Sequence, residues 1–211
     1  MTKFLPIFPL GLLVYPGQHL NLHIFEPRYK QLIKECSEQK KTFGIPSVFG
    51  ETLNEYGTEM ELIEITKVHE GGELDVKTVG RKVFRIMEVI KEVPEKLYSA
   101  AVVFEVEQNP NDTDVLNPTL VDLIAELHKV LGTTFNPYEK FKHPLSYDVA
   151  PYIGLSQEDQ YRLLAAVSEK GRQWFMIEHL QRLIPTLHDA DKIKEKIRQN
   201  GHFKREIPPA F

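Results

Sequence analysis

Cysteine is almost absent from this sequence, since Cys36 is the single one among 211 residues. One thiol cannot form an intramolecular disulfide, which is typical of proteins of the reducing cytoplasm. Long apolar runs are also absent, and none approaches the roughly 18 residues that a membrane span requires. Pro6 and Pro9 interrupt the apolar N-terminus, which lacks a small-residue cleavage site, so we expect no signal peptide. These absences predict a cytoplasmic protein with no membrane partner.

The sequence signatures of catalysis and of metal binding are missing too. There is no G-x-S-x-G, H-E-x-x-H or Cys-x-x-Cys motif, and no Gly-Lys pair from which a Walker phosphate loop could form. His19 and His23 are four residues apart, but on a strand their Cα atoms lie about 13 Å apart, too far to share one ion. The net charge of −4 gives no general attraction to nucleic acid. We therefore predict no enzymatic activity, no cofactor and no metal site.

The first half of the chain has the period of β-structure. Apolar and polar residues alternate over residues 19–25 and 59–68, and Gly71-Gly72 predicts a hairpin that returns through Leu74 and Val76. Further short strands with tight turns are typical of a small barrel or pseudo-barrel. One helix interrupts the pattern after Pro27, and the spacing of its apolar residues predicts a single buried face. That face consists of Tyr29, Leu32, Ile33 and Cys36.

The second half has the period of helices. The turn-rich acidic segment 109–114 is the best internal boundary. After it we expect helices at about 120–131, 146–153 and from Ser156 onward, then a helix striped by Trp174, Ile177, Leu180, Leu183 and Ile184. Pro185 should stop or kink that helix, and a last polar helix should cover about 189–200. The predicted division is 1–108, 115–201 and a tail at 202–211.

Two ordered segments near the N-terminus resemble a known family. Residues 5–17 read LPIFPLGLLVYPG and residues 22–29 read LHIFEPRY. This pair resembles the opening of the LON protease N-terminal, substrate-binding domain family, and the similarity extends over about residues 4–187. The resemblance implies an α+β fold, in which a PUA-like β pseudo-barrel is followed by an α-helical bundle subdomain. That division agrees with the one drawn from periodicity.

The resemblance also implies a function in recognition. A full LON protease continues into an ATPase and a Ser-Lys protease, for which 211 residues leave no room. We therefore expect a stand-alone, non-catalytic module that binds unfolded or extended polypeptide, an adaptor that could serve an ATP-dependent protease. The expected mechanism is an apolar groove between barrel and bundle, with hydrogen bonds to extended backbone.

Six residues are the candidate polypeptide contacts, chosen from the HIFEPRY run and from an aromatic loop at 49–56. They are Tyr15, Phe25, Arg28, Tyr29, Phe49 and Tyr56. The structural alternative is that the HIFEPRY residues only fix a strand-to-helix corner. Two other functions stay open: an RNA-binding PUA-like module, which the diluted basic segment 192–205 does not favour, and a small-molecule sensor.

Overall fold

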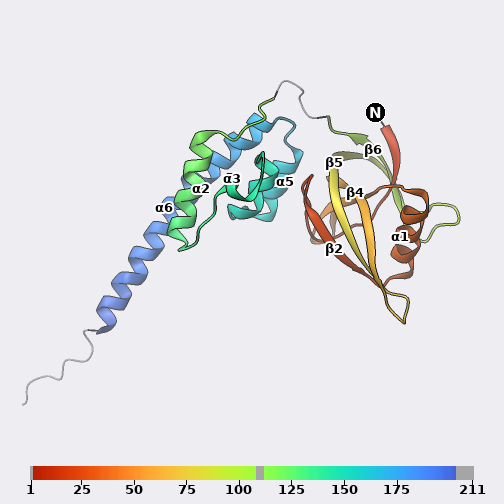
Figure 1. The fold of residues 1–211 in the computed structure, drawn as a ribbon, viewed down its shortest axis with the longest axis horizontal. Helices are drawn as coiled ribbons and strands as arrows, with labels where there is room; N and C mark the ends of the chain where they lie inside the picture. Colours follow the sequence, from red (N-terminus) through yellow and green to blue (C-terminus); the bar gives the residue numbers. More distant parts are fainter. Residues whose placement is uncertain (1, 108–111, 203–211) are drawn as a thin grey trace, which may run out of the picture.

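The computed structural model describes residues 2–107 and 112–202 and places a β-barrel beside a set of helices (Figure 1). The barrel contains β1 (Thr2–Pro6), β2 (His19–Ile24), α1 (Pro27–Gln39), β3 (Phe43–Phe49), β4 (Thr52–Val68), β5 (Leu74–Ile90) and β6 (Ala100–Glu105). The helical subdomain contains α2 (Pro118–Val130), α3 (Pro137–Lys140), α4 (Ser146–Val149), η1 (Ala150–Tyr152), α5 (Gln157–Ala165) and α6 (Glu169–His202). The predicted α+β class is confirmed.

One antiparallel sheet forms the barrel, with the strand order β1-β6-β5-β4-β3 and β2 paired to β5. Two isolated parallel bridges, Ile7 to Gly44 and Leu10 to Ser47, bring the segment after β1 back to β3. The sheet thus almost closes on itself, as a pseudo-barrel does. The predicted hairpin is present, because Val68 at the end of β4 pairs with Leu74 at the start of β5.

Helix α1 buries the four residues that its spacing predicts: Tyr29, Leu32, Ile33 and Cys36. They pack in one cluster with Phe43 and Met60 of the barrel wall. Pro27 stands in the first turn, where its missing N–H costs no hydrogen bond, and Lys40 ends the helix in the left-handed conformation with φ 50°.

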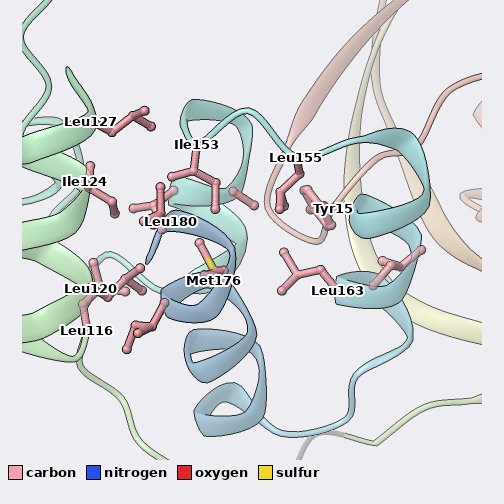
Figure 2. Close-up of a cluster of buried hydrophobic side chains, with 14 of the residues drawn as sticks. Tyr15, Leu116, Leu120, Ile124, Leu127, Ile153, Leu155, Leu163, Met176 and Leu180 are labelled. Carbon is pink, nitrogen blue, oxygen red and sulfur yellow. The ribbon is translucent and has the colours of Figure 1, made fainter. Parts of the chain in front are cut away.

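The core of the helical subdomain reaches the barrel through Tyr15 and Val83, which are buried in the same cluster. Leu120, Ile124 and Leu127 of α2 face Met176 and Leu180 of α6, and Tyr15 enters the same cluster from the barrel beside Leu155 and Leu163 (Figure 2). Polar caps define the helix starts: the Asn117 side chain accepts from the Thr119 N–H, and the Ser156 side chain accepts from the Asp159 N–H.

Two expectations for the last helices are wrong. Helix α6 runs through Pro185 without ending, so the separate polar helix at 189–200 does not exist. Apolar residues on both sides of the proline, Ile184 and Leu187, pack against the helical core, and this packing offsets the lost backbone hydrogen bond. Trp174 is 53% exposed rather than part of the buried stripe. Residues 203–211, most of the expected tail, lie outside the described residues.

Within the described part of the chain, no helix combines the length and the apolar character that crossing a bilayer requires.

Candidate functional site

The structure divides the six predicted contact residues into two groups at opposite ends of β2. Tyr15, Phe49 and Tyr56 lie where the barrel meets the helices, and we call them the junction group. Phe25, Arg28 and Tyr29 lie where β2 leads into α1, and we call them the corner group.

The junction group attaches the barrel to the helical subdomain. Tyr15 is buried, its ring stacks on Tyr147 at 5.1 Å, and its hydroxyl donates to the Gln160 carbonyl at 3.2 Å. Phe49 and Tyr56 both meet the Tyr161 ring edge-on, at 5.4 and 6.0 Å between centroids. Burial raises the pKa of Tyr15 and of Tyr147, that of Tyr147 to about 12, so both phenols stay neutral. A bound segment could touch Tyr15 only by displacing its helical neighbours.

A buried charge cluster supports the Tyr147 side of this contact. The Arg172 guanidinium lies 4.3 Å from the centre of the Tyr147 ring and pairs with Glu169 at 2.8 Å. The Glu169 carboxylate also accepts from the Ser146 N–H at 2.7 Å and from the Ser146 hydroxyl at 2.6 Å. These bonds satisfy a charge pair that is almost fully shielded from water.

The corner group combines one buried and two exposed side chains. Tyr29 is buried and stacks on Phe8 with 3.7 Å between ring centroids. Arg28 pairs with Glu26 at 2.7 Å and lies over the Tyr29 ring, so the structural role of this corner is present. Phe25, however, is 62% exposed, and a large exposed aromatic beside a charged side chain is available to a ligand.

Strand β2 connects the two groups and has a free edge. Within residues 2–107 and 112–202 its only partner strand is β5. The Gly80 N–H donates to the Gln18 carbonyl at 2.9 Å, and hydrogen-bonded pairs recur every second residue in an antiparallel ladder. Leu20 and Leu22 therefore direct their backbone groups to β5, whereas Asn21 and His23 direct theirs away from it. Figure 1 shows β2 on the side of the barrel that faces the helices.

A cavity of about 430 Å³ lies between α1, β1 and the segment that precedes β6. Its wall includes Cys36, Glu35 and Tyr98. Burial raises the pKa of the Cys36 thiol to about 11, so the thiol is protonated at neutral pH and a weak nucleophile. The Tyr98 hydroxyl donates to Glu35 at 2.6 Å and lowers the pKa of that carboxyl.

Sequence reasoning missed the residues that the helical half contributes to the junction. Tyr147 and Tyr161 contact Tyr15 and Tyr56 across more than 100 residues of chain, a separation over which periodicity carries no signal. It also missed that His23 lies beside Asp75 and His69, which come from another strand and a turn.

Comparison with known proteins identifies the family. The model of the ATP-dependent protease La (LON) substrate-binding domain matches residues 4–182. Among curated proteins, cereblon of Danio rerio is 32% identical over 93 residues, 40% of this chain and 22% of that protein. A LON peptidase N-terminal domain and RING finger protein of Schizosaccharomyces pombe is 33% identical over 105 residues, 41% of this chain and 21% of that protein. The matched regions thus span about a fifth of these curated relatives.

Solved structures agree in fold. A Lon N-terminal domain protein from Xanthomonas campestris superposes with a TM-score of 0.64 at 24% identity, over 87% of this chain and 99% of that one. The N-terminal domain of a Mycobacterium avium complex Lon protease gives 0.58 at 15% identity, over 85% and 98%. Because the family model covers most of the sequence, this chain belongs to the ATP-dependent protease La (LON) substrate-binding domain family.

Proposed function

We propose that this chain is a non-catalytic recognition module that binds extended polypeptide segments by adding them as a strand to the free edge of β2. The observation that carries the proposal is the outward-facing backbone of Asn21 and His23, which lies next to no other strand of the described residues. A free edge presents a row of donors and acceptors that an extended peptide can pair with, whatever its side chains.

The two residue groups give this edge apolar ends. Phe25 and Arg28 are exposed directly after β2, so they can contact an apolar or acidic side chain of the bound segment. Phe49 and Tyr56 are half-buried at the junction, with Tyr15 buried behind them. In this proposal Phe25 and Arg28 touch the polypeptide, Phe49 and Tyr56 flank it, and Tyr15 and Tyr29 hold the two ends in place.

The family supports a role in substrate recognition. The curated relatives are much longer proteins, one of which is named for a LON N-terminal domain together with a RING finger. By analogy, this chain would act as an adaptor that presents bound polypeptide to a partner, and an ATP-dependent protease is the partner that the family suggests.

A matched pair of variants at one position tests the edge. Asn21→Pro removes an N–H that points away from β5, so the ladder with β5 loses no donor. Proline is tolerated at such a position, on the solvent side of an edge strand. Asn21→Ala removes the side chain and keeps the N–H. One backbone hydrogen bond contributes about 0.5–1.5 kcal/mol, so we expect Asn21→Pro to weaken binding by about two- to twelvefold. Asn21→Ala should leave the affinity unchanged.

The measurement is fluorescence anisotropy of a labelled unstructured polypeptide, titrated with the protein without ATP at low and at high salt. Saturable binding that persists at high salt, and that Asn21→Pro alone weakens, supports the proposal. If neither variant changes the affinity, β2 is not the docking edge. Binding that collapses at high salt would favour RNA, and no binding at about 100 μM protein would exclude free-standing polypeptide recognition.

A further inference from the structure

Two histidines and an aspartate from three separate segments converge at the end of the barrel that carries the β4–β5 hairpin. His23 belongs to β2, His69 to the turn between β4 and β5, and Asp75 to the second residue of β5. The Asp75 carboxylate lies between the two rings, with 2.6 Å from Oδ1 to His23 Nδ1 and 2.8 Å from Oδ2 to His69 Nε2. From this geometry we propose a site for a divalent transition metal ion, Zn²⁺ above all, that no comparison assigns.

The backbone fixes the three side chains toward one point. His23 and Asp75 are directly opposite in the β2–β5 ladder, so their side chains leave the same face of the sheet. His69 is held by its turn, since its N–H donates to the Glu73 carbonyl and its carbonyl accepts from the Gly72 N–H, both at 2.9 Å. Backbone hydrogen bonds of the β2–β5 ladder and of the turn therefore hold these three residues, which are distant in sequence, close together.

The distances suit a zinc ion. Zinc bonds of about 2.0–2.1 Å in a tetrahedron separate the ligand atoms by about 3.4 Å. The three ligand atoms lie within 4.8 Å of one another, and the two His–Asp separations are shorter than that ideal by less than about 1 Å. Because all three side chains are at least 30% exposed, the rings can rotate to admit the ion.

The donor set selects the kind of metal. Two imidazole nitrogens and one carboxylate oxygen favour zinc and its neighbours, whereas magnesium and calcium prefer six or more oxygen ligands. Three protein ligands leave a fourth position open for water or for another ligand. A hollow lined by His23, Asp75, Asn21 and Thr66 adjoins the cluster and gives that fourth ligand room.

The nearby lysines form no ion pair with the Asp75 carboxylate among the described residues. Lys77 pairs with Glu64 at 2.6 Å. Lys67 stands opposite Asp75 in the ladder, but both oxygens of Asp75 accept from the histidines. The ordinary alternative to a metal site is a surface His–Asp–His ion pair, which contributes little stability, and the experiment below separates the two.

The test is calorimetric titration of the tag-free full chain with ZnCl₂, and with MgCl₂ in parallel. We expect one zinc site, no magnesium binding, and at least a tenfold loss of zinc affinity in His69→Ala and in Asp75→Asn, because even partners outside the ligand set typically contribute about 10- to 100-fold. His19→Ala is the matched control, since His19 is an exposed histidine on the same strand outside the cluster. The zinc affinity of His19→Ala should stay within about twofold of that of the parent chain.

Visible absorption of the Co²⁺ form gives a second readout, because tetrahedral cobalt absorbs far more strongly than hydrated cobalt. The proposal is overturned if the parent chain binds no zinc at about 100 μM, or if His19→Ala weakens binding as much as His69→Ala does. Circular dichroism checks that each variant keeps its fold. His69→Ala changes the turn and Asp75→Asn changes β5, so a local folding defect in one variant does not affect the result from the other.

Discussion

Two ion pairs of nearly equal length differ strongly in burial. Arg172 and Glu169 in α6 are 2.8 Å apart, with 4% and 5% of their side chains exposed. Arg162 and Glu158 in α5 are 2.7 Å apart, with 60% and 72% exposed. Each pair lies within one helix, and the buried Arg172 also donates to the Ser146 hydroxyl and the Ala166 carbonyl, both at 2.8 Å.

We predict that Arg172→Met and Arg162→Met have very different costs. Methionine is compatible with a helix and keeps most of the aliphatic volume of arginine. In Arg172→Met the Glu169 carboxylate stays buried without its counter-charge, and breaking a buried pair in this way costs about 3–5 kcal/mol of unfolding free energy. In Arg162→Met the freed carboxylate is hydrated, and an exposed pair one helical turn apart is worth about 0.3–0.5 kcal/mol.

A double variant tests the physical reason. Adding Glu169→Gln to Arg172→Met removes the uncompensated charge, while the amide oxygen can still accept from the Ser146 N–H. The double variant should therefore be more stable than Arg172→Met alone. Urea unfolding followed by far-UV circular dichroism and by the fluorescence of Trp174 measures all four proteins. If Arg172→Met costs no more than Arg162→Met, water reaches the buried pair and the reasoning from its burial is refuted.

Two further predictions concern the cavity beside α1. The Cys36 thiol, buried and with its pKa raised to about 11, should react with a maleimide only as fast as the chain opens, and rapid labelling of the native protein would contradict this. The Tyr98 hydroxyl lowers the pKa of Glu35, so the stability that this carboxylate contributes is present above its unfolded pKa and is lost as pH falls through its folded pKa. In Tyr98→Phe the unfolding free energy should therefore fall less steeply as pH is lowered between about pH 5 and 3. An unchanged slope would be the opposing result.

The sequence predicted the features that depend on neighbours within about one turn. The buried face of α1 was correct in all four residues, because helical spacing decides which side chains share a face. The β4–β5 hairpin followed from Gly71-Gly72 and the alternation beside it. The separate polar helix shows the limit: local pattern divided the chain after Pro185, but packing on both sides of the proline keeps α6 continuous.

The six candidate contacts stay a prediction, and the structure shows how differently they are placed. Phe25 and Arg28 are exposed beside a free edge, but Tyr15 and Tyr29 are buried, because a phenol suits a core when its hydroxyl finds a partner or stays near the surface. The partner of Tyr15, the Gln160 carbonyl, is 145 residues away. No pattern within the barrel half could have indicated it. The approach of His69 to His23 depends in the same way on the register of β5.

The two proposals meet at His23 and yet use different atoms of it. A polypeptide added to β2 would pair with the backbone of Asn21 and His23 at the strand edge, whereas a metal ion would bind the His23 imidazole on the sheet face. His69→Ala should therefore weaken zinc binding by at least about tenfold and leave peptide affinity unchanged. Asn21→Pro should weaken peptide binding by about two- to twelvefold and leave zinc affinity unchanged. If zinc nevertheless tightens peptide binding, linkage requires that the peptide tighten zinc binding by the same factor. Such coupling would show that the metal ion and the bound strand interact, directly or through β2, because a ligand shifts an affinity only where its interactions differ between the two states.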